Sequence, residues 1–251
     1  MDPAFPALRA AANQVGVGAW AVGGYVRDRL LGRPHPDLDM VVEEGEALTL
    51  ARTFARLVKA RPPIEFPRFG TARVVWGKRV VEFASARRES YTPNSRNPEV
   101  VPASLTEDLL RRDFTINTLL MDLAGGVHDL LGARADIERR LLRTPSDPIQ
   151  TFSDDPLRML RGVRFAAELG FELERGLLPT MSKLAPRLGP PVVAVERIRE
   201  ELIRILVSPR PSSGIELLWQ GGLLERIWPE VAAGRGVEQG GWHTHDVYGH
   251  T

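Results

Sequence analysis

Short apolar runs alternate with amphipathic stretches in the first third of the chain. Residues 18–24 and 37–43 are compact apolar runs bounded by glycine or acidic residues, which predicts strands. Residues 25–32 and 46–60 place apolar side chains at helical spacing, which predicts helices. Strands and helices are therefore expected to alternate in this part of the chain.

The next pattern is a pair of strands. Residues 71–77 and 79–86 are predicted to form a hairpin that is closed at Gly77 and Lys78. The polar stretch Ser90–Ala103 that follows contains three prolines and is predicted to be a mobile loop.

From about residue 104 onward, almost every segment of the chain has helical periodicity. Ser104 and Glu107 match a capping box, which predicts a helix over residues 105–123. Residues 195–206 carry one apolar stripe with charges opposite, as expected of an amphipathic helix. No internal repeat is evident, which argues against a solenoid. The pattern predicts an α+β chain, in which a part with a short mixed sheet precedes an all-helical part.

Composition limits the class of protein. The chain has 251 residues, is 43% hydrophobic and has a formal net charge of +1, which fits a soluble globular protein. All but three of its 33 basic residues are arginines, which suits phosphate binding but equally fits a GC-rich genome. The absence of cysteine excludes disulfides and thiolate metal sites. Without a signal-like start or an apolar run of membrane length, we expect no membrane partner and a cytoplasmic protein.

Two aspartates stand two residues apart in a predicted strand. Side chains alternate in a strand, so Asp37 and Asp39 are expected on one face. Their mutual repulsion is relieved most simply by a divalent metal; Mg²⁺ prefers such oxygen ligands, and phosphoryl transfer often uses two ions. Glu82, in a later strand, could complete the cluster. The alternative is that the aspartates are merely the polar end of a strand.

Two glycines lie where the predicted strand of residues 18–24 ends and the next predicted helix begins. Gly23 and Gly24 would let backbone N–H groups approach a triphosphate at the positive end of the helix. Arg27, in the first turn of that helix, could reach the same phosphate. The glycines and the aspartates together predict a nucleotide site.

A third candidate lies in residues 111–117. Asp113 and Asn117 are four residues apart, so one helical face would present both to a ribose hydroxyl pair. Arg112 is four residues from Asp108, and the alternative to a substrate contact is an ion pair on the helix surface.

An arginine stripe follows farther along the chain. Asp155 and Arg158 could form a rigid pair whose outer edges imitate the Watson–Crick edge of a base. Arg161 and Arg164 continue the same face and would suit a triphosphate or an RNA backbone. The alternative is a solvated helix face.

These motifs together resemble a known family. Residues 23–28 with 37–39, then 111–117, then 154–165, have the order and spacing of the class II, bacterial-type tRNA nucleotidyltransferases and poly(A) polymerases. The resemblance extends from about residue 20 to about residue 229. It implies a polymerase-beta-like nucleotidyltransferase head that uses two metal ions, transfers a nucleotide monophosphate to an RNA 3′ hydroxyl and releases pyrophosphate.

The resemblance also implies roles for residues in the head. Asp37 and Asp39 would be the metal ligands, and Gly24 and Arg27 would contact the triphosphate. In residues 111–113, the RRD motif, Arg112 would contact a phosphate or the sugar, and Asp113 the ribose.

In the helical part, the resemblance implies that Asp155 and Arg158 select cytosine or adenine. The family motif normally begins with Glu-Asp, whereas Asp154 precedes Asp155 here, so the role of Asp154 is open. Arg197 is expected to brace the base-reading helix.

The resemblance predicts three parts. Residues 1–143 would be the catalytic head, 144–230 a neck and body for base selection and tRNA binding, and 231–251 a tail. The tail resembles the start of a His-Asp phosphohydrolase domain, so we expect a longer natural protein. The residues concerned are His243, His245, Asp246 and His250.

The predicted activity is the addition of CCA, or of only the terminal adenosine, to the tRNA acceptor end from CTP and ATP. The segment Ser90–Ala103 lies where the family has a flexible element that CC-only enzymes tend to lack, which argues against a CC-only enzyme. Two alternatives remain: a poly(A) polymerase, and a noncatalytic RNA-binding relative.

Overall fold

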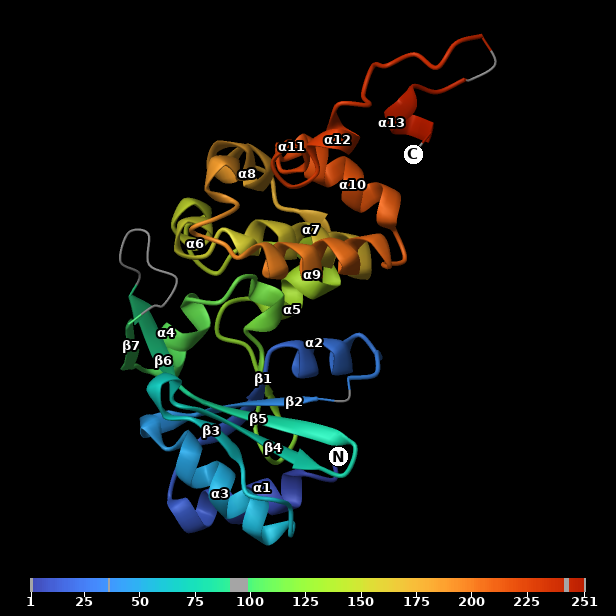
Figure 1. The fold of residues 1–251 in the computed structure, drawn as a ribbon. Helices are drawn as coiled ribbons and strands as arrows, with labels where there is room; N and C mark the ends of the chain where they lie inside the picture. The colour runs from blue at the N-terminus through green and yellow to red at the C-terminus, as the bar shows by residue number, and fades with distance from the viewer. Residues whose placement is uncertain (1, 36, 91–98, 242–243, 251) are drawn as a thin grey trace. The chain divides into compact units, whose positions relative to one another are not determined.

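The computed structural model describes residues 2–35, 37–90, 99–241 and 244–250 (Figure 1). These residues form two compact units, the first ending at residue 139 and the second comprising residues 140–250. The first contains the large sheet and the second is mainly helical.

The first unit is built on a seven-stranded sheet of order β3-β4-β5-β2-β1-β8-β9. Its strands are β1 (Ala19–Val22), β2 (Leu38–Val42), β3 (Ile64–Phe66), β4 (Thr71–Trp76), β5 (Arg79–Ser85), β8 (Leu120–Met121) and β9 (Val127–His128). β2 and β5 are parallel and every other neighbouring pair is antiparallel, so the predicted mixed sheet is confirmed. The predicted hairpin is confirmed too, with Trp76 opposite Arg79.

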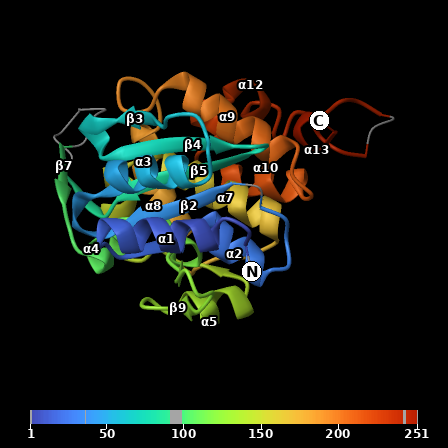
Figure 2. The ribbon, with the colours of Figure 1, turned by 90° about the horizontal axis from the view of Figure 1, so that it is seen from below.

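Two helices pack side by side against one face of this sheet, as Figure 2 shows. They are α1 (Phe5–Val15) and α3 (Ala47–Leu57). Leu8, Leu50 and Phe54 are fully or almost fully excluded from solvent in the same core as Phe83 of β5. Burial of these apolar side chains stabilises each helix, because a short isolated helix is only marginally stable in water. The core therefore fixes the strand that carries Glu82.

The remaining helical segments of the first unit are short. They are α2 (Gly24–Leu30), α4 (Leu105–Leu110), α5 (Ala133–Glu138) and 3-10 turns at Glu43–Gly45, Pro67–Phe69 and Thr115–Asn117.

The predicted long helix over residues 105–123 is wrong. The capping box of Ser104 and Glu107 is present, but α4 ends at Leu110. The Asp113 carboxylate accepts hydrogen bonds from the backbone N–H of Phe114 and the side chain of Asn117, and such local bonds compete with a helix. The following apolar residues instead form β8, which pairs with β1.

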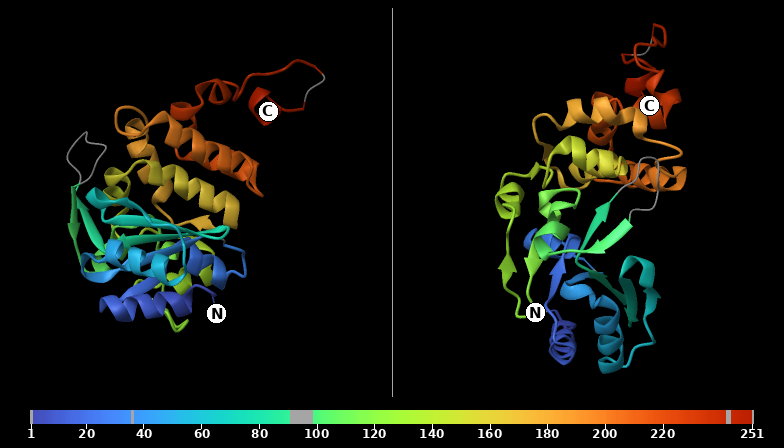
Figure 3. Two further views of the ribbon diagram at one scale, coloured as in Figure 1. Left: turned by 60° about the horizontal axis from the view of Figure 1, so that its bottom comes forward. Right: turned by 90° about the vertical axis from the view of Figure 1, so that its left-hand side faces the viewer.

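The prediction of a loop over Ser90–Ala103 is wrong at both ends of the segment, where the structure has strands. β6 (Arg87–Ser90) and β7 (Glu99–Pro102) pair as an antiparallel hairpin, drawn in green apart from the large sheet in Figure 3. Residues 91–98, the rest of that stretch, lie outside the described residues.

The second unit consists mainly of helices. They are α6 (Pro148–Asp154), α7 (Leu157–Leu169), α8 (Leu177–Leu184), a 3-10 turn at Ala185–Arg187, α9 (Val195–Leu206), α10 (Pro211–Gln220), α11 (Leu224–Ile227), α12 (Pro229–Ala232) and α13 (Val247–His250). α7 and α9 pack side by side (Figures 1 and 3), so the predicted helix at residues 195–206 is confirmed.

A small parallel pair of strands completes the second unit. β10 (Leu141–Leu142) pairs with β11 (Glu172–Leu173). The first unit thus ends a few residues before the predicted head boundary at 143; the boundaries at 143 and 230 stay predictions. In the part of the chain that the structure describes, no helix has both the length and the hydropathy needed to span a bilayer.

Candidate active site

The site begins at the glycine turn between β1 and α2. Gly23 has φ 72° and ψ −140°, a conformation that residues with a side chain rarely adopt. A Cβ atom on Gly23 would lie 3.5 Å from both Arg112 Nη1 and Asp39 Oδ2. A Cβ atom on Gly24 would lie 2.9 Å from His35 Nε2. The turn therefore places bare backbone next to a carboxylate and a guanidinium.

Replacing Gly23 with alanine is expected to cost about 1–3 kcal/mol of stability through backbone strain and to weaken nucleotide binding. Gly77→Ala is the matched control, because Gly77 also has a positive φ, 63°, in the same unit, but a Cβ there would meet no atom within 4 Å. Urea unfolding and equilibrium binding of CTP measure the two effects. Equal CTP affinity in the two variants would contradict a role for Gly23 in binding.

The carboxylates lie on β2 and β5 and in the segment before β2. Asp39 lies directly opposite Glu82 in the parallel pair. Burial raises the pKa of Asp39, and the negative charges of Glu82 and Asp37 raise it further, whereas His35 and Arg112 oppose the shift. The three acidic groups thus influence one another electrostatically. Without a bound cation, their proximity disfavours the ionised form of Asp39.

Glu82 forms an ion pair with a residue of the neighbouring strand, and its part in the acidic cluster stays a prediction. Arg73 of β4 donates a hydrogen bond of 2.5 Å to Glu82 Oε1, and both side chains are about half exposed. Among the described residues, no three His, Asp or Glu side chains lie close enough together to hold a metal ion. The donor set of Asp37 and Asp39 nevertheless fits a hard divalent cation, because it consists of carboxylate oxygens whose mutual repulsion such an ion would relieve.

Arg112 presents an incompletely paired cation to this site. Its Nη2 donates to Asp108 Oδ2 at 2.9 Å, and Asp108 is only 1% exposed. The ion pair of the alternative is therefore present, but it is largely buried and does not lie on a helix surface. Arg112 Nε is buried and has no hydrogen-bond partner, an arrangement that costs stability unless a ligand supplies the acceptor.

Arg27 belongs to a buried hydrogen-bond chain. Its guanidinium donates twice to Asp28 and once, at 2.8 Å, to the side-chain oxygen of Asn117. Asn117 in turn donates to Asp113 at 2.9 Å. Asp113 and Asn117 thus meet as predicted, although no continuous helix joins them. The chain anchors α2 to the RRD motif; the triphosphate and ribose contacts of its members stay predictions.

A pocket of about 360 Å³ joins these features. Asp39, Glu82 and Arg112 line it, together with Phe66 and Arg73. Its lining thus combines two carboxylates with two guanidinium groups, which suits a metal-bound phosphate ester.

The second unit contains the predicted base-reading residues, but the predicted Asp155–Arg158 pair is not formed. Asp155 accepts a hydrogen bond of 2.9 Å from Arg197 instead, and Arg158 donates to the backbone oxygen of Thr151 at 3.1 Å. Arg158 lies at the buried N-terminal end of α7, whose start brings its side chain back onto α6. The contact of Arg197 agrees with its predicted bracing role; base selection stays a prediction.

Arg164 is a core residue in this structure. It is 2% exposed, donates to Glu201 at 2.6 Å and Glu168 at 2.7 Å, and lies over the ring of Phe165. The side chain of Arg161 is 35% exposed and lies 3.8 Å from Glu201. The expectation that both arginines form one ligand-facing stripe is therefore wrong for Arg164; a ligand contact of Arg161 stays a prediction.

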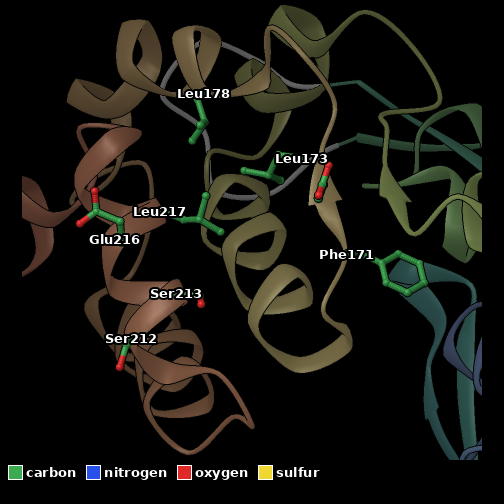
Figure 4. Close-up of a pocket in the computed structure, with 8 residues that line it drawn as sticks. Phe171, Leu173, Leu178, Ser212, Ser213, Glu216 and Leu217 are labelled. Atoms are coloured by element: carbon green, nitrogen blue, oxygen red, sulfur yellow. The ribbon is translucent and has the colours of Figure 1, made fainter.

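A second pocket, of about 550 Å³, lies in the helical unit (Figure 4). Leu173, Leu178 and Leu217 extend into it from β11, α8 and α10, and its acidic lining residues are Glu172 and Glu216. No arginine or lysine is among the described residues that line it, so it offers no charge to neutralise a phosphate.

Sequence reasoning missed four residues around the site: His35, Phe66, Arg73 and Arg79. Nothing in the periodicity marks them. Only strand register places Arg73 opposite Glu82, and only the path before β2 brings His35 to Gly24. Of the candidate tail residues, His243 lies outside the described residues.

Comparison with protein families gives two matches. The family described as the poly A polymerase head domain matches residues 19–143. The family described as the probable RNA and SrmB-binding site of polymerase A matches residues 170–234. The first match contains the glycine turn and all three carboxylates.

Similar curated proteins differ in what they add. An A-adding tRNA nucleotidyltransferase of Aquifex aeolicus is 45% identical over 68% of this chain and 21% of its own length. A CCA-adding enzyme of Streptococcus gordonii is 39% identical over 88% of this chain and 53% of its own. A CC-adding tRNA nucleotidyltransferase of Thermus thermophilus is 39% identical over 93% of this chain and 50% of its own. The chain thus spans about half the length of the latter two.

Solved structures agree with the sequence matches. One similar structure is a tRNA nucleotidyltransferase complexed with a primer tRNA and an incoming ATP analogue, with a TM-score of 0.75 and 34% identity. The match covers 93% of this chain and 64% of that one. The family matches, the similar sequences and the similar structures all indicate the same family. The chain therefore belongs to the tRNA nucleotidyltransferase and poly(A) polymerase family.

Proposed function

We propose that this chain carries the catalytic and base-selecting parts of a tRNA nucleotidyltransferase that adds CCA, or only the terminal adenosine, to tRNA 3′ ends. CTP and ATP are the donors and pyrophosphate is released. One observation carries the proposal: Asp39 and Glu82 share a pocket with Arg112, whose Nε is buried without a partner. Carboxylates for a cation and a guanidinium with one N–H donor to spare for an anion are what a metal-bound triphosphate requires.

The reaction forms one ester bond and breaks one anhydride bond. The oxygen of the RNA 3′ hydroxyl attacks the α-phosphorus of the nucleotide, and the bond from that phosphorus to the β-phosphate oxygen breaks. The hydroxyl gives up its proton to solvent water, and the departing pyrophosphate takes the electron pair of the broken bond. Since attacking and leaving oxygens must stand nearly in line, positioning supplies much of the catalysis.

Asp37 and Asp39 would hold Mg²⁺, with two ions proposed, and the metal would lower the pKa of the attacking hydroxyl and neutralise the triphosphate. The residues of the chain orient the partners. Arg112 would donate its free Nε–H to the nucleotide, and the bare backbone at Gly23 and Gly24 would let the triphosphate approach closely. The buried Arg27–Asn117–Asp113 chain would keep the ribose contacts in place.

The helical unit would select the base and grip the tRNA. Support comes from the family match at residues 170–234 and from exposed arginines on this unit, such as Arg199, Arg204 and Arg210. Contacts between arginines and phosphates release counterions, so tRNA binding should weaken steeply with salt. Because tRNA is the substrate, we propose a cytoplasmic location.

The test is incubation of the protein with tRNA that lacks its 3′ terminus, Mg²⁺, CTP and ATP, followed by sequencing of the added 3′ end. Addition of CCA identifies a complete CCA enzyme. Addition of only A, to tRNA already ending in CC, identifies an A-adding enzyme. Long adenosine tails on unrelated RNA would instead identify a poly(A) polymerase. No incorporation of either nucleotide, despite tRNA binding, would favour a noncatalytic relative and contradict the proposal.

A further inference from the structure

The N-terminal segment places a buried carboxylate between α2 and β5 of the first unit. The Asp2 side chain is 7% exposed and forms a two-pronged ion pair with Arg79 at the start of β5, with both N–O distances 2.8 Å. Asp2 Oδ2 also accepts a hydrogen bond of 2.9 Å from the hydroxyl of Tyr25 in α2. One carboxylate thus links the helix after the glycine turn to the strand that carries Glu82.

Both partners of Asp2 are linked to Asp37, Tyr25 through His35 and Arg79 through its charge. The Tyr25 ring packs edge-on against the His35 ring, with centroids 6.3 Å apart. His35 Nδ1 lies 2.7 Å from the backbone oxygen of Asp37, and because a carbonyl oxygen only accepts, this nitrogen donates. On the other side, the pKa of Arg79 is raised chiefly by its bond to Asp2 and also by the negative charge of Asp37.

Asp37 has no regular structure of its own to hold it. It precedes β2, which begins at Leu38, and its side chain is exposed. A ligand in such a position must be oriented by the groups around it, because a small displacement of a reacting or binding group costs much of its effect. The groups around it include His35, which donates to its backbone oxygen, and the positive charge of Arg79. Asp2 binds Arg79 directly and is linked to His35 through Tyr25.

We propose that Asp2 is a positioning residue, which acts through Tyr25, His35 and Arg79 to hold Asp37 in the orientation needed to bind a divalent metal ion. This inference rests on the proposed function. It assigns a role in the active site to a residue 35 positions away from Asp37 in the sequence. Replacement of Asp2 by asparagine removes its charge with little change of shape.

The readout is metal binding in the absence of substrate. Mn²⁺ serves as the probe, and its dissociation constant for the whole chain is measured by electron paramagnetic resonance. Asp2→Asn should raise this constant about tenfold, the effect expected when a group supporting a metal ligand is removed. In the nucleotide addition assay, the Mg²⁺ concentration for half-maximal rate should rise similarly, and saturating Mg²⁺ should restore much of the rate.

Glu65→Gln is the matched control. It removes a two-pronged pair with Arg52 that links α3 and β3 in the same unit, at 2.6 and 2.7 Å. Metal affinity should not change in this variant. A purely structural role for Asp2 would lower the Tm of Asp2→Asn without moving the Mn²⁺ constant, and that result would overturn the proposal.

A second variant covers the case in which Asp2→Asn does not fold. Tyr25→Phe removes only the hydroxyl and leaves the Asp2–Arg79 pair in place, and it should raise the Mn²⁺ constant about threefold. Unchanged Mn²⁺ binding in a folded Tyr25→Phe protein would overturn the proposal. Failure of the proposed function is a distinct result, because the wild type would then add no nucleotide while the Mn²⁺ comparison between variants still stands.

Discussion

Replacement of Asp39 by asparagine is expected to lower the rate of nucleotide addition by at least about a thousandfold, since metal stabilisation of the developing charge contributes several kcal/mol. Asp39 faces the pocket beside Arg112 and Glu82, where a neutral amide cannot replace an ionised metal ligand. The measurement is the single-turnover rate with labelled CTP or ATP at saturating tRNA. A rate within tenfold of the wild type would defeat the assignment.

Loss of the fold does not account for this expected loss of rate. The pKa of Asp39 is raised in the folded chain, chiefly by burial and then by Glu82, so the ionised form is less favourable there than in the unfolded chain. Above this raised pKa, the carboxylate therefore costs stability when no metal is bound. Asp39→Asn should keep or raise the Tm of the metal-free protein at neutral pH, which scanning calorimetry would measure. A lower Tm would contradict the prediction that the ionised Asp39 carboxylate destabilises the metal-free protein.

The largest expected loss of stability comes from Glu201→Ala in α9. Glu201 and Glu168 hold the buried guanidinium of Arg164, and removal of one partner leaves a charge incompletely paired in the core of the helical unit. The cost of breaking a buried pair in this way is about 3–5 kcal/mol. Urea unfolding of the whole chain, followed by far-UV circular dichroism, measures it.

Two further variants separate the buried charge from the general effect of substitution. Arg204 pairs with Glu168 at 3.4 Å and its side chain is 55% exposed, so Arg204→Ala should cost less than about 1 kcal/mol. Arg164→Met combined with Glu201→Leu should recover most of the loss, because apolar side chains of similar volume often replace a buried ion pair without penalty. If Glu201→Ala costs no more than Arg204→Ala, the pair does not hold α7 to α9.

The elements with clear periodicity were predictable. Alternation and turn residues were enough for β1, β2, and the β4–β5 hairpin, and helical spacing was enough for α3 and α9. Each of these elements buries one face, so the spacing of its apolar residues shows directly which face is buried and whether the element is a helix or a strand. Residues 105–123 were not predictable in this way, because side-chain bonds of Asp113 and a pairing with β1 override the local helical pattern.

The candidate site was predictable as a set of residues, but most of its contacts were not. Spacing alone indicated the glycine turn at Gly23 and Gly24 and the acidic pair of Asp37 and Asp39. The order of the motifs indicated the family. The sequence could not show that Arg158 bonds to Thr151, that Asp155 bonds to Arg197, or that Arg164 is buried. A long arginine side chain has several partners within reach, and which one it meets depends on the packing of helices.

The sequence by itself therefore determined the strands and helices that bury one face, the glycine turn, the acidic pair and the motif order, because each depends on neighbouring residues. The tertiary structure alone decided the register that sets Glu82 beside Asp39, the pairing of Arg73 with Glu82 and the reach of Asp2 to Tyr25 and Arg79. These contacts join residues far apart in the chain, and their geometry follows from how the sheet and its covering helices pack.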